Sequence, residues 1–240
     1  LVGILNGLDT NTFDPKKDTS IKARFDLSNY EHARTVNKRA LQKIFMLPNK
    51  PNAFLIGYVG RLAQQKGINL ITSMLPHLLT EYPNIQLVVL GGGDEADRTK
   101  LMQLQKLYPE QIGLHLMPDF LMPRKVFAGA DGLLLPSMFE PGGIVALESL
   151  RYGAVPIVRR TGGLNDIITD FVPTSISGNG FSFSSKTDWA LYGAIVRALT
   201  TFENKKIWSR LVENCLRADF SWEHVASEYQ KWYRQVRIEG

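Results

Sequence analysis

Residues 133–164 carry the sequence pattern that most restricts the fold of this chain. Two apolar runs enclose a polar turn, a helix-like run and a glycine. In order, the expected strand, turn, helix, glycine and second strand occupy residues 133–135, 136–143, 144–152, 153 and 154–158. This is a β-turn-α-turn-β unit, from which parallel sheets with covering helices are built. Because ligands of open α/β sheets bind outside the carboxyl ends of the strands, we expect a ligand at these turns.

The same alternation extends over most of the chain. The segment from Ala53 to Val158 contains about five strand-helix units, which predicts an α/β fold with a Rossmann-like, doubly wound parallel sheet and flanking helices. Further strands are expected at residues 53–59, 85–90, 111–117 and 180–183, and residues 1–8 are expected to form a strand that runs into a turn at 6–9. Further helices are expected at residues 31–45, 68–82, 95–108, 123–130, 165–171, 187–202, 205–218 and 222–236.

The polar turn in the organising unit has the composition of a ligand site. Gly142 and Gly143 let the backbone approach a ligand closely. The first amides of the following helix, over Gly143–Val145, lack intrahelical acceptors, and the positive end of the helix dipole favours a phosphate there. Glu140 suits sugar hydroxyls, and Glu148 follows it by about two helical turns. The alternative interpretation is an ordinary turn with a solvated Glu140 and a helix-surface Glu148.

Two further turns combine glycine with charge. Gly60 ends the apolar run FLIGYV, and Arg61 and Lys66 follow it before the next helix. Arg offers a planar fork and Lys a compact charge, both suited to phosphate oxygens, although surface exposure is the commoner role of both residue types. The strand at 85–90 ends in Gly91-Gly92-Gly93-Asp94. Its spacing is not the G-x-G-x-x-G of dinucleotide sites, so a nicotinamide enzyme is disfavoured.

Composition excludes several functional classes. No run of about 18 apolar residues is present, so no membrane span is expected. The single cysteine, Cys215, and four scattered histidines provide no metal-ligand spacing, and so few cysteines favour the cytoplasm or a comparable reducing compartment. The net charge of +5 comes without an arginine-rich run or interleaved aromatic residues, so nucleic acid is not an expected partner. The chain does not begin with Met, and we expect it to be part of a longer protein.

Motifs along nearly the whole chain resemble one protein family. FEPGGIVALESLRYG followed by VPIVRRTGGLND is similar to the C-terminal nucleotide-sugar domain of retaining GT-B glycosyltransferases, most of all to bacterial glycogen synthases and plant starch synthases. Further matches, in the family's order, are GILNGLDTNTFDP, NKRALQ, GRLAQQKG, VVLGGGD, GADGLLLPS and DFSW. The chain departs from the family at Gly142, where Cys is usual, and at Pro118, where bacterial glycogen synthases often have an aromatic residue. The E-x7-E spacing of Glu140 and Glu148 is more typical of the broader retaining GT-B group.

The resemblance implies transfer of glucose from ADP-glucose to the non-reducing end of an α-1,4-glucan, with retention at the anomeric carbon. Arg61, Lys66 and Glu140 would be the catalytic residues: the two cations would stabilise the departing diphosphate, and the carboxylate would bind the sugar. The other expected donor-binding residues are Gly60, Gly91, Gly92, Asp94, Met117, Asp119, Gly142, Gly143, Ile144, Val145, Glu148, Thr161, Gly162 and Gly163. This scheme requires no cofactor and no metal.

The resemblance also implies a division of the chain. Residues 1–30 would cross from an N-terminal GT-B domain, residues 31–220 would form the nucleotide-sugar domain, and a C-terminal helix at 221–240 would pack back towards the N-terminal domain. An aromatic stripe on that helix would be partly exposed in the isolated domain; it consists of Trp222, Val225, Tyr229, Trp232 and Tyr233. The N-terminal domain of the family carries a lysine-glycine-glycine-leucine motif and an active-site histidine, and neither is matched here. We therefore expect the isolated chain to bind nucleotide weakly and to show no turnover.

Two alternatives to this function remain open. The first is a retaining GT-B transferase that uses a UDP- or GDP-sugar, and the second is a non-catalytic nucleotide-binding or regulatory domain of the same fold. The expected location is the cytoplasm, or the plastid in a plant or alga.

Overall fold

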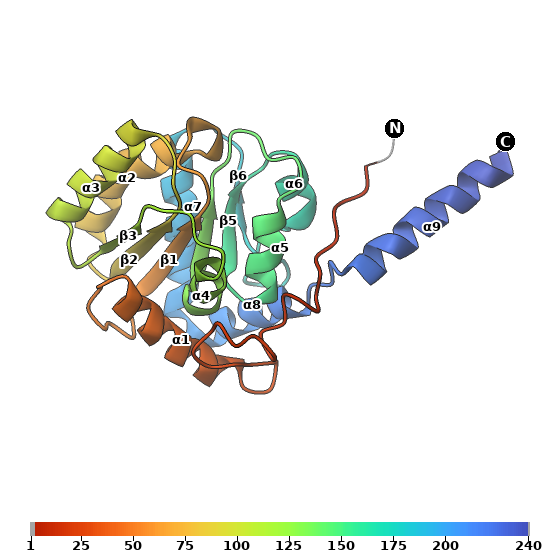
Figure 1. Cartoon of the computed structure of the whole chain (residues 1–240), viewed down its shortest axis with the longest axis horizontal. Coiled ribbons are helices and arrows are strands. Elements are labelled where there is room, and N and C mark those ends of the chain that lie inside the picture. The colour runs from red at the N-terminus through yellow and green to blue at the C-terminus, as the bar shows by residue number, and fades with distance from the viewer. Residues whose placement is uncertain (1–2, 240) are drawn as a thin grey trace.

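The structure, a computed structural model, describes the backbone of residues 3–239 and the side chains as far as residue 236. A six-stranded sheet with the strand order β3-β2-β1-β4-β5-β6 lies at its centre, and every neighbouring pair is parallel. The strands are β1 (Phe54–Val59), β2 (Ile85–Leu90), β3 (Ile112–His115), β4 (Gly132–Leu135), β5 (Val155–Arg159) and β6 (Phe181–Phe183). The order reverses between β1 and β4 (Figure 1), which confirms the predicted doubly wound sheet.

Helices cover both faces of the sheet (Figure 1). They are α1 (Tyr30–Ile44), η1 (Gln64–Lys66), α2 (Ile68–Glu81), α3 (Glu95–Leu107), α4 (Met122–Gly129), α5 (Ile144–Arg151), α6 (Gly163–Ile167), α7 (Asp188–Glu203), α8 (Lys205–Arg217) and α9 (Trp222–Glu239). The helix α2 packs against α3 and α7, whereas α4 packs against α1 and α5. Covered on both sides, the central strands are largely apolar, and all six residues of β2 are buried. No helix in the described part of the chain is long and apolar enough to cross a membrane.

The segment NKRALQ anchors α1 to the amino ends of the strands. Asn37 exchanges hydrogen bonds with the backbone of Ala23, at 2.9 Å from the Ala23 N–H and 2.8 Å to its carbonyl. Lys38 Nζ lies 2.6 Å from Asp131 Oδ2, just before β4. The same carboxylate oxygen accepts the Leu55 N–H of β1 at 2.8 Å. These polar groups are therefore used inside the fold, far from the carboxyl ends of the strands.

The strand predicted ahead of the turn at residues 6–9 is wrong for the residues that the structure describes. Residues 3–7 contain no strand, and Leu8 forms an isolated bridge with Ser221. The Leu8 N–H donates to the Phe220 carbonyl at 2.7 Å. An apolar run becomes a strand only where a neighbouring segment pairs with its backbone hydrogen-bonding groups. Among these residues only Leu8 has such a partner. Leu1 and Val2, which belong to the same prediction, lie outside the described residues.

The helix predicted at 165–171 begins two residues earlier and ends four residues earlier in the structure. It is α6, which ends at Ile167. Beyond it, the Thr169 N–H donates to Asn179 Oδ1 at 2.8 Å and the Phe171 N–H donates to the Gly180 carbonyl at 2.8 Å. These tertiary hydrogen bonds replace the ones that would have continued the helix.

The C-terminal helix α9 begins where the sequence predicts it. Ser221 Oγ accepts the His224 N–H at 3.2 Å, a helix N-cap. Figure 1 shows α9 projecting from the body of the molecule on the same side as the N-terminal segment. Val225 is 1% exposed, whereas Tyr233 is 69% exposed and Tyr229 is also exposed. Most of the aromatic stripe on this helix is thus open to solvent.

Candidate functional site

Two adjoining cavities open at the carboxyl ends of the strands. The larger, of about 790 Å³, lies at the ends of β1, β2 and β3, and the smaller, of about 160 Å³, lies at the ends of β1 and β4. Val59 and Gly60 line both cavities, so the cavities meet at the end of β1. The strand order reverses at this point, which is where open α/β sheets usually bind ligands. A cavity of about 1080 Å³ along α1 contains none of the predicted site residues.

The smaller cavity contains a close ion pair. Lys66 Nζ lies 2.6 Å from Glu140 Oε2, and Ser137 Oγ donates to the same oxygen at 3.3 Å. Lys66 comes from η1 after β1, and Glu140 comes from the turn after β4, so the two residues converge from different crossovers. Gly143 and Val145 at the start of α5 also line this cavity. The rest of its wall is formed by Tyr58, Val59, Gly60, Leu135, Ala146 and Leu164.

The start of α5 presents free backbone donors beside this pair. Gly143 adopts φ +62° as the N-cap residue, and a Cβ there would lie 2.8 Å from Ile167 Cδ1, so a larger residue would be strained and crowded. The N–H groups of Ile144 and Val145 form no hydrogen bond among the described residues. These amides and the helix dipole make the cavity suitable for an anion.

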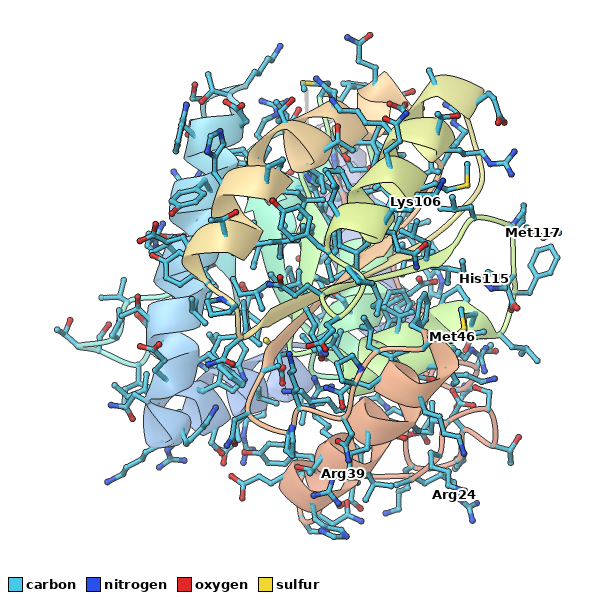
Figure 2. The ribbon with its side chains drawn as sticks, turned by 90° about the vertical axis from the view of Figure 1, so that its left-hand side faces the viewer. Arg24, Arg39, Met46, Lys106, His115 and Met117 are labelled. Carbon is cyan, nitrogen blue, oxygen red and sulfur yellow. The ribbon has the colours of Figure 1, made fainter. Side chains whose placement is uncertain are left out.

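The larger cavity brings together six of the predicted residues. Besides Gly60, which lines both cavities, they are Arg61, Gly91, Gly92, Met117 and Asp119. Met117 lies on the loop that follows β3, and Figure 2 shows it at the outer edge of the molecule. The wall is completed by Val59, Leu90, Gly93, Arg98, Leu116, Pro118, Phe120 and Pro123. A wall rich in glycine and apolar groups, with two arginines, suits a flat ligand that carries a negative charge.

Backbone contacts hold the turn after β1 against the turn after β2. The Leu62 N–H donates to the Gly92 carbonyl at 2.8 Å, and the Asp94 N–H donates to the Leu62 carbonyl at 3.0 Å. A Cβ on Gly91 would lie 1.8 Å from the Gly60 carbonyl oxygen, so the two chains approach too closely for any side chain. Asp94 itself is exposed at the start of α3 and lines neither cavity.

The carboxylate of Asp119 has a structural role in addition to its place in the cavity wall. Its Oδ1 accepts the N–H groups of Leu121 and Met122, each at 2.8 Å. These hydrogen bonds from Met122 and Leu121 lower the pKa of Asp119. Asp119 thereby organises the turn that leads into α4.

The structure places five more of the predicted residues beside the cavities and not in their walls: Gly142, Ile144, Thr161, Gly162 and Gly163. Their turns frame the residue Glu140 instead. The Gly163 N–H donates to the Glu140 carbonyl at 3.0 Å, and a Cβ on Gly162 would lie 2.3 Å from the same carbonyl oxygen. The glycines are therefore required for close packing of the two turns.

Glu148 also lies outside both cavity walls. It is half-buried on α5, and the charged residue that affects its pKa is Arg124 of α4. Burial raises the pKa of Glu148 to about 7, and Arg124 offsets this only in part. The carboxyl group is thus divided between its protonated and charged forms at neutral pH.

Several residues of the site were not predicted from the sequence. Tyr58 is buried, and its hydroxyl donates to the Arg61 carbonyl at 2.8 Å; in the sequence it is simply one residue of an apolar strand. Arg98 Nε is buried without a partner among the described residues. Ser137 could have been found as the polar residue that follows the run LLLP. Arg159 lies beneath the Glu140 turn, and no sequence pattern indicates its role.

No group of three or more His, Cys, Asp or Glu side chains that could hold a metal ion occurs in the part of the chain that the structure describes. The expectation that the reaction needs no metal or cofactor stays a prediction.

The fold is that of a Rossmann-like domain, and its strand ends suit a phosphate-bearing ligand, because glycine turns, cations, a carboxylate and a helix start converge at the switch point of a parallel sheet. Comparison with known families is more specific. The model of the glycosyl transferases group 1 family matches residues 41–213. The chain belongs to this family.

Proteins with similar sequences support the family that the motifs indicate. Glycogen synthase 2 of Nitrosococcus oceani is 43% identical over 239 residues, and glycogen synthase 1 of Synechocystis sp. is 40% identical over 236 residues. Each match covers 98% of this chain but only 48% and 49% of those proteins, so the chain spans about half the length of the curated relatives it matches. The predicted resemblance to bacterial glycogen synthases is confirmed.

Solved structures give the same result. The catalytic domain of starch synthase IV from Arabidopsis thaliana, bound to ADP and acarbose, matches with a TM-score of 0.87 and 32% identity, over 98% of this chain and 48% of that chain. Anabaena HepE in complex with UDP matches with a TM-score of 0.68 and 16% identity, over 97% of this chain and 57% of that chain, and shows the fold alone. The predicted C-terminal half of a GT-B fold is confirmed.

Proposed function

We propose that this chain is the donor-binding half of a retaining glycosyltransferase of the glycogen or starch synthase type. The complete enzyme would transfer glucose from ADP-glucose to the non-reducing end of an α-1,4-glucan. The observation that carries the proposal is the small cavity shared by Lys66, Glu140 and the start of α5, which adjoins the cavity of Arg61. Cations and free amides suit a diphosphate, and a carboxylate beside them suits sugar hydroxyls, so one donor molecule would satisfy both.

The proposed chemistry breaks the bond between the glucose and the diphosphate. In the transition state positive charge develops on the sugar and negative charge on the departing diphosphate. Arg61, Lys66 and the amides at the start of α5 stabilise that negative charge, and preorganised donors of this kind are usually the largest catalytic contribution. Without a donor Lys66 pairs with Glu140. When the donor binds, Lys66 turns to the phosphate oxygens and Glu140 accepts hydrogen bonds from the sugar.

Similarity supports ADP as the nucleotide. The Arabidopsis starch synthase IV structure, at 32% identity, is a complex with ADP. A UDP- or GDP-sugar is the second candidate, because Glu148 completes the E-x7-E spacing of the broader retaining group. In that case the carboxyl group of Glu148 would turn towards the nucleotide from its place between α4 and α5.

The proposed partners of the donor domain are an N-terminal GT-B domain and an α-glucan. Residues 1–30 would lead from the N-terminal domain, residues 31–220 would hold the donor, and α9 would pack back through its exposed aromatic stripe. We also propose a cytoplasmic location, or a plastid in a plant or alga. Its support is the thiol of Cys215, which is buried and free.

Nucleotide binding by the 240-residue chain tests the donor assignment. We expect ADP to raise the melting temperature more than UDP or GDP. Arg61→Ala and Lys66→Met should each weaken ADP binding by about tenfold or more, because each removes a charged donor to phosphate. Lys43→Met, an exposed cation on α1, is the matched control and should bind as the parent does. Unchanged ADP binding by both site variants would show that the diphosphate lies elsewhere.

Glucan synthesis separates an enzyme from a non-catalytic domain. We expect no transfer from ADP-glucose by the isolated chain, and transfer by the complete protein. Appreciable synthesis by the isolated chain would contradict the requirement for the N-terminal domain. A complete protein that binds ADP-glucose but transfers no glucose would favour the regulatory alternative.

A further inference from the structure

Arg159 is a buried cation directly beneath the proposed site. It is the last residue of β5 and is 5% exposed. Its Nε donates to the Ser137 carbonyl at 2.8 Å, and its Nη2 donates to the Met138 carbonyl at 2.5 Å. Burial lowers the pKa of Arg159, and no charged neighbour in the described chain offsets that effect. Both of its identified partners are therefore uncharged carbonyl groups of a single turn.

That turn is the one that carries Glu140. Two other contacts hold it in place: the Met138 N–H donates to the Gln65 carbonyl at 2.8 Å, and the Gly163 N–H donates to the Glu140 carbonyl at 3.0 Å. The first contact reaches the residue before Lys66, and the second reaches the glycine turn after β5. Arg159 adds a third support, from the sheet below.

A guanidinium at this position is costly. Burial of a charge without a counter-ion is unfavourable, and an apolar residue would continue the strand VPIV at lower cost. Hydrogen bonds from a charged donor are stronger than neutral ones, and the fork geometry of arginine allows two at once. Here both are directed at successive carbonyls, which fixes the position and the orientation of the turn.

We propose that Arg159 is a positioning residue, which fixes the turn at 136–141 so that the Glu140 carboxylate is held opposite Lys66. Arg159 acts through backbone carbonyls and does not itself contact the donor. The inference deepens the proposed function and rests on it in one respect, because the Lys66–Glu140 pair belongs to the proposed donor site.

A double-mutant cycle tests the positioning without any ligand. Lys66→Met and Glu140→Gln are combined in the parent chain and in an Arg159→Met chain, and urea unfolding is measured for every variant. In the parent the two substitutions should be non-additive, because the ion pair couples them. In the Arg159→Met chain, where the side chain is long but uncharged, the coupling should vanish. A purely structural Arg159 would lower the stability of every variant equally and leave the coupling intact, which would overturn the proposal.

Two further variants sharpen the result. Arg160→Met is the matched control, since Arg160 is the exposed neighbour and its Nε binds Ser182 Oγ at 2.9 Å; it should leave the coupling unchanged. Arg159→Lys keeps the charge but cannot reach both carbonyls with a planar fork, so it should retain only part of the coupling. If Arg159→Met does not fold, Arg159→Lys decides: a reduced coupling supports the proposal and an unchanged coupling overturns it.

Donor binding distinguishes this inference from the proposed function. We expect Arg159→Met to weaken the binding of ADP-glucose more than that of ADP. The dissociation constant of ADP divided by that of ADP-glucose should fall by about tenfold, the effect of one lost hydrogen bond to a charged group. The phosphate contacts of Arg61 should keep ADP itself bound. An unchanged ratio would contradict the positioning of Glu140. If the parent binds neither ADP nor ADP-glucose, the proposed function is wrong, while the unfolding cycle still decides the role of Arg159.

Discussion

Lys66 and Glu140 are 74 residues apart in the chain, yet their charged atoms meet in one cavity. The pair has two consequences for a ligand-free protein. It holds the Lys66 ammonium group next to the position where phosphate would bind. It also provides a counter-ion for the Glu140 carboxylate, which lies in a half-buried site. A donor must therefore exchange this ion pair for its own contacts.

Removal of the Glu140 charge should strengthen the binding of a donor fragment that lacks the sugar. In Glu140→Gln, Lys66 is no longer held by a carboxylate and phosphate meets no negative neighbour, so ADP affinity should rise by about three- to tenfold at low salt. Isothermal titration with ADP measures this change. Glu110→Gln, which alters an exposed carboxylate paired with Lys50, is the control and should have no effect. Unchanged ADP binding by Glu140→Gln would place the diphosphate away from this carboxylate.

The carboxyl group of Glu148 should make the protein less stable as the pH rises. Its pKa is about 7 in the folded chain, against 4.5 for an ordinary Glu. Between these values the folded state holds more protons than the unfolded state, so the free energy of unfolding falls as the pH rises through this window. Glu148→Gln should remove this loss. Calorimetry at pH 4, 6 and 8 would show the melting temperature of the variant gaining on that of the parent; parallel curves would contradict the burial of Glu148.

At the scale of elements, one buried ion pair is among the contacts that join α1 to the sheet. Lys38 is buried, donates to Asp131 Oδ2 at 2.6 Å, and also donates to the Ala53 carbonyl. Asp131 in turn accepts the Leu55 N–H. This pair thereby connects α1 to the amino ends of β1 and β4, whereas the proposed site lies at the carboxyl ends of the strands.

Lys38→Met should destabilise the chain by about 3–5 kcal/mol, because it leaves the Asp131 carboxylate without its cation. Lys38→Met combined with Asp131→Asn should recover part of this loss, since no unpaired charge remains. Urea unfolding measures both variants. Lys43→Met on the exposed face of the same helix is the control and should change the stability by less than about 0.5 kcal/mol. A small effect of Lys38→Met would mean that water replaces the cation.

At the scale of the whole molecule, α9 contacts the rest of the protein mainly through its first turn. Trp222 packs near Gly7, where an added Cβ would lie 2.6 Å from the Trp222 ring, and Val225 is buried. Beyond them the helix projects from the body of the molecule (Figure 1). Exposed aromatic side chains on such an element are characteristic of an interaction surface, in agreement with the proposed contact to an N-terminal domain.

Deletion of residues 229–240 should therefore cost little stability. We expect the free energy of unfolding to change by less than about 0.5 kcal/mol, because nearly all the described side chains of this stretch are exposed and such side chains contribute little to it. The truncated chain should also self-associate less, as sedimentation at several concentrations would show. Val225→Ser is the contrasting variant and should destabilise the chain, because it places a hydroxyl in the core. A large loss on truncation would mean that the distal part of α9 packs on the body.

The sequence by itself determined the sheet and most of its helices. Parallel strands that are covered on both faces must be largely apolar, and glycines must follow them where backbones cross closely, so runs such as IQLVVL followed by GGG mark a strand and its carboxyl end. Local signals were equally reliable at the start of α9, where Ser221 supplies the cap. They failed for α6, where Thr169 and Phe171 bond to a distant segment and the helix stops early.

Only the tertiary structure decided which charges meet. Lys66, Glu140 and Arg61 were predicted to act together, but the sequence did not show that Lys66 pairs with Glu140 in one cavity while Arg61 lines the next. The spacing in the sequence suggested that Glu148 acts together with Glu140, whereas the structure places Glu148 outside both cavity walls. No sequence pattern indicated the role of Arg159. Hydrophobic periodicity is a property of neighbours in the chain, and it determines the elements. The direction of a polar side chain depends on which turns the packed sheet brings together, which no local pattern records.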